Sequence, residues 1–188
     1  MRSSGNTPSR SPRPPIRRLV VVLGDDDPKA CTGRRMLRRG LALPSSRRDA
    51  GARPIVLDPF AAEPLSRKDR ATAESQGILV VDGSWNRLSD RGRLDLPTSG
   101  GLPRGPHRRL PMLVAANPQH YGRLGELNSV EALGAALYLV GRPDEAATLL
   151  SEFAGGDAFL EINRGRFAAY ARAPSPDGIR RAEQRLFR

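Results

Sequence analysis

Short apolar runs separated by polar segments fill the first part of the chain. Four of these runs are rich in Val, Ile and Leu, which is typical of buried β-strands. They cover residues 18–23, 54–57, 77–82 and 110–116. Turn residues follow them, for example Gly24 after the first run and Asn117-Pro118 after the last. The pattern therefore predicts four strands.

Two short helices are expected between these strands. Thr32 is the candidate N-cap of the first helix, which ends at Gly40. The second helix covers residues 66–75, where Ser66 and Asp69 have the spacing of a capping box.

From residue 129 onward the pattern is helical. Residues 129–140 are apolar or small at nearly every position, which predicts a helix buried on all sides. Asn128 or Ser129 caps this helix and Gly141 ends it. Three further helices are expected over residues 143–153, over residues 157–170 with Asp157 as the cap, and from Ser175-Pro176 to the end of the chain.

These elements give the expected fold class, α/β. An N-terminal part over residues 18–109, built on a mixed sheet, precedes a mostly helical C-terminal part over residues 110–188. Residues 1–17 are Ser, Pro and Arg with almost nothing apolar, so we expect a disordered basic tail. Residues 86–109 have no apolar period, and a loop of this length is either functional or disordered.

The charge of the chain favours an anionic partner. Lys and Arg total 31 against 20 Asp and Glu, a formal net charge of +11 over 188 residues. Such an excess attracts polyanions, and RNA is the first candidate. Arg supplies nearly all of this positive charge, as it does in Arg-rich proteomes, so charge alone does not establish RNA binding.

Several kinds of site are excluded or disfavoured. The single cysteine, Cys31, forms no internal disulfide, and neither His107 nor His120 has partners at metal-ligand spacing, so no metal site is expected. Neither a dinucleotide-binding glycine motif nor a phosphate loop is present. No apolar run reaches the ~20 residues that a membrane-spanning helix needs, and we expect a cytoplasmic protein.

Polar and aromatic residues cluster where the predicted strands end. Thr32 follows the first strand, Asp82 and Trp85 follow the third, and Asn117 follows the fourth. Ligands bind at the carboxyl ends of strands in α/β sheets, and this set suits an adenosine ligand with a cationic sulfur. Taken singly, each residue also has an ordinary structural explanation, such as core packing for Trp85 or helix capping for Asp82 and Thr32.

Three motifs carry a resemblance to a known family. They are Asp27-Pro28-Lys29-Ala30-Cys31-Thr32-Gly33, Val81-Asp82-Gly83-Ser84-Trp85, and Leu110 to Gly122 followed by Leu127 to Leu133. In these motifs the chain resembles the ribosomal RNA aminocarboxypropyltransferases shared by archaea and eukaryotes. The resemblance covers residues 19 to 170, nearly the whole chain.

The resemblance implies a fold like that of the SPOUT methyltransferases, with a trefoil knot in the cofactor region. It also implies S-adenosylmethionine as the donor of a 3-amino-3-carboxypropyl group. The acceptor would be N3 of a hypermodified uridine or pseudouridine in small-subunit rRNA, free or in a pre-ribosomal particle. By position, the residues at the cofactor would be Thr32, Val81, Asp82, Trp85, Leu110, Gly125 and Ser129. Gly125 stands where the family has an aromatic residue, which would leave that contact to the backbone.

Hypotheses about individual roles follow from this chemistry. Trp85 would hold the methyl group and the cationic sulfur by packing and cation–π attraction. Thr32 would bind the amino-acid portion. Asp82 would either help to accept the N3 proton or only orient the cofactor. Four arginines beside Thr32 are either an RNA-facing patch or a solvated helix face; they are Arg34, Arg35, Arg38 and Arg39.

Two other functions remain open on the sequence alone. A SPOUT-type RNA methyltransferase would use the same cofactor but present its methyl carbon. A non-catalytic assembly factor would bind pre-ribosomal RNA through the Arg-rich surface without the cofactor. The enzyme is expected to be a monomer, as the resemblance implies.

Overall fold

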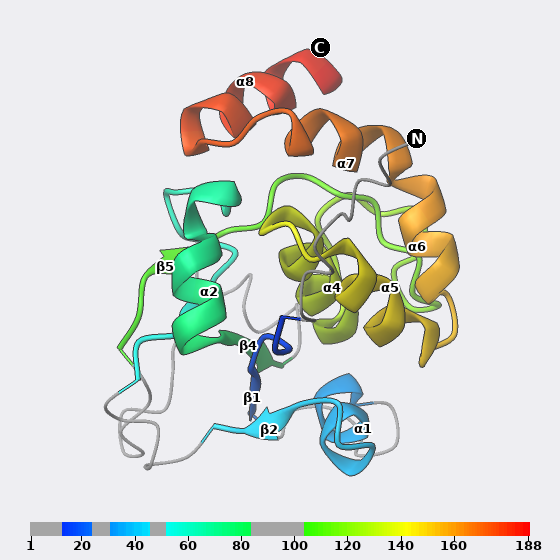
Figure 1. Cartoon of the computed structure of the whole chain (residues 1–188). Helices are drawn as coiled ribbons and strands as arrows, with labels where there is room; N and C mark the ends of the chain where they lie inside the picture. The colour runs from blue at the N-terminus through cyan, green and yellow to red at the C-terminus, as the bar shows by residue number, and fades with distance from the viewer. Residues whose placement is uncertain (1–12, 24–30, 46–51, 84–103) are drawn as a thin grey trace, which may run out of the picture.

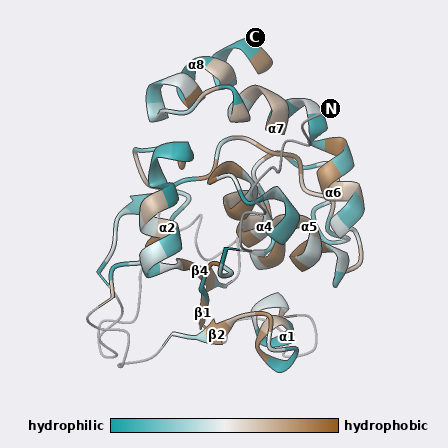
Figure 2. Cartoon of the chain, in the orientation of Figure 1, coloured by the Kyte–Doolittle hydropathy of each residue, from teal (hydrophilic) through white to brown (hydrophobic). Residues whose placement is uncertain are grey.

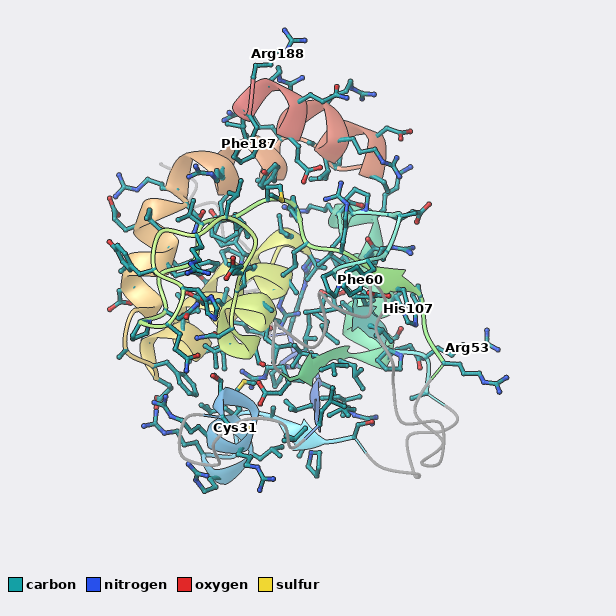
Figure 3. The ribbon with its side chains drawn as sticks, turned by 180° about the vertical axis from the view of Figure 1, so that it is seen from behind. Cys31, Arg53, Phe60, His107, Phe187 and Arg188 are labelled. Atoms are coloured by element: carbon teal, nitrogen blue, oxygen red, sulfur yellow. The ribbon has the colours of Figure 1, made fainter. Side chains whose placement is uncertain are left out.

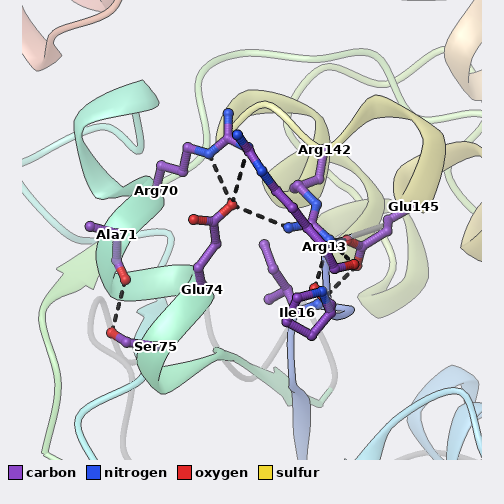
Figure 4. A network of polar contacts seen from close by, with 9 residues as sticks. Arg13, Ile16, Arg70, Ala71, Glu74, Ser75, Arg142 and Glu145 are labelled. Carbon is purple, nitrogen blue, oxygen red and sulfur yellow. Dashed lines mark hydrogen bonds and ion pairs between the residues drawn. The ribbon is translucent and has the colours of Figure 1, made fainter. Parts of the chain in front are cut away.

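The computed structural model describes residues 13–23, 31–45, 52–83 and 104–188 (Figure 1). Trp85, residues 1–12 and most of the predicted loop at 86–109 lie outside these ranges. Residues 13–17, which we assigned to the disordered tail, instead pack against the fold. Ile16 is buried and donates its N–H to Glu145 Oε2 at 2.9 Å, while Arg13 lies 3.8 Å from Glu74 (Figure 4).

A five-stranded sheet forms the base of the fold. Its strands are β1 (Arg18–Val22), β2 (Leu43–Pro44), β3 (Ile55–Leu57), β4 (Ile78–Asp82) and β5 (His107–Arg108), in the order β2-β1-β4-β3-β5. Every pairing between them is parallel, within the α/β fold that the sequence predicts. The first three predicted strands are confirmed. The two edge strands, each of two residues, were not predicted.

Eight helical segments complete the described chain. They are α1 (Thr32–Arg38), the 3-10 turn η2 (Arg67–Asp69), α2 (Arg70–Gln76), α4 (Ser129–Leu139), α5 (Pro143–Ser151), α6 (Gly156–Ile162), α7 (Arg164–Ala171) and α8 (Pro176–Leu186). The helices of the C-terminal half lie together above the sheet in Figure 1, while α1 lies below them beside β2.

The capping predictions are mostly confirmed. Asn128 caps α4, Ser175 caps α8, and the Asp69 carboxylate accepts the Ser66 N–H at 3.0 Å. Two are wrong. Cys31, not Thr32, caps α1, because its sulfur accepts the Arg34 N–H. The helix predicted over residues 157–170 is two helices, α6 and α7, divided at Asn163, and the first is capped by Gly155 rather than Asp157.

The fourth predicted strand, residues 110–116, is also wrong. Here only Val114 forms a bridge, to Leu124, and side chains from distant helices bind other backbone groups that a neighbouring strand would use. Glu183 accepts the Met112 N–H at 3.0 Å. Asn163 accepts the Val114 N–H and donates to the Val114 carbonyl, both at 2.8 Å. The segment therefore satisfies its hydrogen bonds without joining the sheet.

Buried helix α4 is the centre of the hydrophobic core. It contacts β4, α1, α5 and α7, and one cluster of buried side chains joins residues of the sheet to residues of the C-terminal helices. Figure 2 shows apolar residues along α4. The prediction of a helix buried on all sides is confirmed. The division into two domains at residues 109 and 110 stays a prediction, with this cluster extending across it.

The two faces of the sheet differ. Val20, Ile78 and Val80 belong to the main core under α4, whereas Leu19 and Leu79 form a smaller cluster on the opposite face. This alternation follows from the period of two along a strand. Among the described residues, no helix has both the length and the apolar character needed to cross a membrane.

Candidate functional site

The Asp82 carboxylate lies at the carboxyl end of β4, near the middle of the sheet. It is buried, and two neutral side chains donate to it. The Cys31 thiol donates to Oδ2 at 2.7 Å, and the Ser129 hydroxyl donates to Oδ1. Cys31 caps α1 and Ser129 is the first residue of α4. The carboxylate therefore sits between the N-termini of two helices.

This position suits a negative charge. Helix N-termini carry unpaired N–H groups and partial positive charge, which stabilise a carboxylate nearby. Gly33 allows the close approach, since a Cβ at this position would lie 2.8 Å from Asp82 Cβ and Oδ2. Any larger residue would push α1 away from the strand end.

Cys31 is a hydrogen-bond donor rather than a nucleophile. Burial raises the pKa of the thiol above its ordinary value, and the hydrogen bond to Asp82 raises this pKa further. A thiol with a raised pKa stays protonated and unreactive at neutral pH. The sequence alone did not indicate this contact between Cys31 and Asp82. Cys31 stands directly before the start of a helix, and this position was the one local sign that its side chain could have a structural partner.

The charge of Asp82 has no cationic partner within the described residues. Buried carboxylates are normally paired, and this chain has a large excess of arginine. A ligand with a positive group would complete the site. S-adenosylmethionine has two such groups, its sulfonium and its α-ammonium, so the residues present fit this donor.

A second buried carboxylate, Glu131, organises the segment before α4. It accepts hydrogen bonds from three donors, which are the Ala116 N–H at 2.7 Å, the Asn117 Nδ2 at 2.7 Å and the Asn128 N–H at 3.0 Å. Glu131 thus ties residues 115–128 to the first turn of α4. The sequence did not indicate this role of Glu131, because its three hydrogen-bond partners are brought together by tertiary structure.

Comparisons with known proteins show the family of this chain. A family profile described as "Ribosome biogenesis protein, C-terminal" matches residues 55–187. The 16S rRNA aminocarboxypropyltransferase of Methanopyrus kandleri is 42% identical over 167 residues, which are 88% of this chain and 95% of that protein. The protein of the same name from Thermoplasma acidophilum is 40% identical over 168 residues, 89% of this chain and 96% of that protein.

This chain belongs to the 16S rRNA aminocarboxypropyltransferase family. A solved structure described as the SAM-dependent rRNA:acp-transferase of Vulcanisaeta distributa aligns with a TM-score of 0.75 and 32% identity. The alignment covers 91% of this chain and 97% of that chain. The family resemblance found in the three sequence motifs is confirmed.

The structure brings only some of the residues predicted from the family motifs close to Asp82. Ser129 contacts it directly, and Thr32 lies between Cys31 and Gly33, which both approach it. Thr32 is half-buried. Trp85, the proposed contact for the methyl group, lies outside the described residues.

The other three predicted residues of the family site form no hydrogen bond with the Asp82 carboxylate in the described structure. Val81 belongs to the opposite face of the sheet from Asp82, so its backbone is the part that could reach a ligand at the strand end. Leu110 is partly buried against the core. Gly125 has φ +82°, a conformation that favours glycine over the aromatic residue of the family, and its N–H donates to Leu113 O at 2.8 Å.

The histidines of this family member are paired with single carboxylates. His107 Nδ1 lies 2.7 Å from Asp58 Oδ2, and His120 Nδ1 lies 2.5 Å from Glu126 Oε2. Figure 3 shows His107 beside Phe60, far from Cys31. Among the residues that the structure places, no group of three or more His, Cys, Asp or Glu side chains could hold a metal ion.

The four arginines of α1 divide into two pairs. Arg35 and Arg39 lie over the Phe153 ring, with guanidinium carbons 5.0 and 5.2 Å from its centroid. Arg39 also forms an ion pair with Glu152 at 3.6 Å. Arg34 and Arg38 are exposed, and their guanidinium groups have no partner in the described part of the chain. The sequence did not distinguish the two pairs.

Proposed function

We propose that this chain transfers the 3-amino-3-carboxypropyl group of S-adenosylmethionine to a base of small-subunit, 16S-type rRNA during ribosome biogenesis. The observation that carries this proposal is the similarity to a protein named 16S rRNA aminocarboxypropyltransferase. The two chains are 42% identical over an alignment that covers 95% of that protein. The buried Asp82 carboxylate, which lacks a cation in the described structure, supports a cationic donor.

Asp82 would bind the donor rather than act as a base. Two hydrogen bonds from Cys31 and Ser129 stabilise its charged form, and two helix N-termini do the same. Its negative charge would instead attract the positive groups of the donor and fix their position.

Thr32 and Trp85 would complete the hold on the donor. Thr32 would hydrogen-bond the amino-acid portion, since its hydroxyl lies at the start of α1 next to the Asp82 contacts. Trp85 would cover the methyl group. The bound donor would supply an activated γ-carbon. The bond from this carbon to sulfur would break as its bond to the base nitrogen forms, so that the thioether product leaves and the proton of the base nitrogen passes to water. Burial of the methyl would leave the γ-carbon as the reachable centre.

Finer features of the proposal come from the family resemblance. The acceptor atom would be N3 of a hypermodified uridine or pseudouridine, and the substrate would be free rRNA or a pre-ribosomal particle. The backbone near the cofactor would form a SPOUT-type trefoil knot. The enzyme would act as a cytoplasmic monomer. Size-exclusion chromatography with light scattering measures the oligomeric state directly.

The test of the function uses purified protein and small-subunit rRNA that lacks the modification. S-adenosylmethionine is labelled either in its carboxyl carbon or in its methyl group. We expect carboxyl label to enter the RNA and methyl label to stay out. In an Asp82→Asn variant we expect weaker donor binding and a lower transfer rate.

The two alternatives give different results in this experiment. Methyl label alone in the RNA would identify a SPOUT-type methyltransferase. RNA binding without transfer of either label, and without donor binding at micromolar concentration, would identify an assembly factor. Either result would overturn the proposed function.

A further inference from the structure

An exposed aromatic side chain lies on the turn that follows the extended segment at 110–116. Tyr121 is 67% exposed, the highest value among the exposed large hydrophobic side chains of the described residues. Its neighbour Arg123 is also exposed, with 63% of its side-chain surface accessible. The ring has no aromatic partner in the part of the chain that the structure describes.

The turn that carries Tyr121 is held firmly on both sides. The Asn117 Oδ1 accepts the His120 N–H at 3.0 Å, and the Gly122 N–H donates to Ala115 O at 2.8 Å. The Arg123 N–H donates to His120 O at 2.9 Å. Gly122 has φ +81°, which a residue with a side chain rarely adopts. Tyr121 is therefore an exposed ring on a fixed turn, not the tip of a loose loop.

The same turn is anchored next to Asp82. Asn117 binds Glu131 at 2.7 Å, and Glu131 lies in the first turn of α4. Ser129, two residues earlier in that turn, binds Asp82. One helical turn rises only about 5.4 Å, so the anchor of the Tyr121 turn and the Asp82 site share one helix end.

The turn also lies close to the basic helix α1. A Cβ at Gly155 would lie 2.8 Å from Ala116 O, just before the turn. Gly155 follows Phe153, the ring on which Arg35 and Arg39 lie. The Tyr121 turn and two arginines, Arg35 and Arg39, therefore both lie near the segment that follows α5.

We propose that the Tyr121 ring is a stacking platform for an unpaired nucleobase of the rRNA, at or beside the modified uridine. This inference rests on the proposed function. A base must leave its stack before its N3 edge is accessible, and aromatic side chains bind such bases through their faces. Arg123 and the exposed arginines of α1, Arg34 and Arg38, would bind the flanking phosphates.

The test compares three variants in the labelled-transfer assay with a short RNA that contains the modification site. We expect Tyr121→Ala to lower kcat/KM for RNA by roughly 5- to 100-fold, the effect of one lost base–aromatic stack. The affinity for S-adenosylmethionine and the thermal midpoint should stay unchanged. Tyr121→Phe keeps the ring and should retain activity near that of the wild type.

Phe60→Ala is the matched control, because Phe60 is an exposed aromatic that lies outside the Tyr121 turn, after strand β3. It should not change RNA kinetics. If the wild type transfers the group and the kcat/KM of Tyr121→Ala for RNA stays within twofold of the wild-type value, the proposed stacking role of Tyr121 is wrong. Loss of donor binding or of folding in Tyr121→Ala would indicate a structural role and would also overturn it. Absence of transfer by the wild type would instead refute the proposed function.

Discussion

At the scale of single residues, the Asp82 site shows how neutral donors hold a buried charge. Cys31 and Ser129 each bind one carboxylate oxygen, so both oxygens have fixed positions. Neither donor cancels the negative charge. The site therefore combines a defined geometry with an electrostatic preference for a cation, and a cationic donor needs both.

The state of the Cys31 thiol is testable by alkylation. Because burial and the Asp82 hydrogen bond raise its pKa, less thiolate is present at a given pH than in an ordinary cysteine. We expect iodoacetamide to label the native protein at pH 8 far more slowly than the denatured protein. Asp82→Asn removes the negative charge and should speed labelling. Equal rates in the native wild type and the denatured chain would contradict the proposed environment.

At the scale of elements, α4 and α5 pack unusually closely at one position. Gly134 faces Leu150, and a Cβ on Gly134 would lie 2.7 Å from Leu150 Cγ. Leu150 is fully buried. The small residues that the sequence shows along α4 therefore have a packing reason: they let a second helix approach the helix that carries Ser129.

A matched pair of glycine substitutions isolates this contact. Gly134→Ala and Gly165→Ala both replace a helical glycine, but Gly165 has open space around it. Both gain helix propensity of up to about 1 kcal/mol. Only Gly134→Ala overpacks the interface, at a cost of about 1–3 kcal/mol. In urea unfolding, the free energy of unfolding of Gly134→Ala should therefore be lower than that of Gly165→Ala by about 1–3 kcal/mol. Equal stabilities would mean that α5 moves freely away from α4.

At the scale of the whole molecule, the positive charge is divided between structural and available arginines. Arg35 and Arg39 pack on Phe153, and Arg109 binds Glu183 through two hydrogen bonds. Arg34 and Arg38 are exposed on α1, close to the Asp82 site. The net charge of +11 therefore overstates the number of arginines that are free to meet RNA.

The salt dependence of RNA binding separates these classes. Each phosphate contact contributes about −0.7 to −0.9 to the slope of log K against log salt concentration. We expect Arg34→Gln combined with Arg38→Gln to reduce this slope by about 1.5 and to leave the free energy of unfolding unchanged. The matched double variant, Arg35→Gln combined with Arg39→Gln, should instead lower the free energy of unfolding. The reverse pattern would show that we assigned the two pairs wrongly.

Local signals in the sequence predicted much of this fold. Three β-branched runs became the three central strands, and Asn128, Ser66 and Ser175 marked helix starts by their side-chain chemistry. The edge strands are two residues long, too short to produce a period. The segment at 110–116 had the composition of a strand, but Asn163 and other distant side chains bind its backbone.

The candidate site was only partly predictable, for the same reason. Asp82 and Ser129 were identified through motifs, and the structure joins them by a hydrogen bond. The third member, Cys31, was not predicted to belong to the site, since nothing local shows that its thiol meets a carboxylate. Glu131 has three partners that tertiary folding brings together. The sequence shows which residues occur at strand ends, but not which of them meet.

The strand order has a consequence for the synthesis of the protein. Leu19 pairs with Leu79, and Asp82 meets Cys31, 51 residues before it, and Ser129, 47 residues after it. Closing such long loops is slow, and domains fold as the chain emerges from its N-terminus. While the nascent chain still holds α4 inside the exit tunnel, Asp82 lacks its second partner. An enzyme that modifies ribosomal RNA would thus become able to bind its donor only after the ribosome that makes it has released helix α4 from the tunnel.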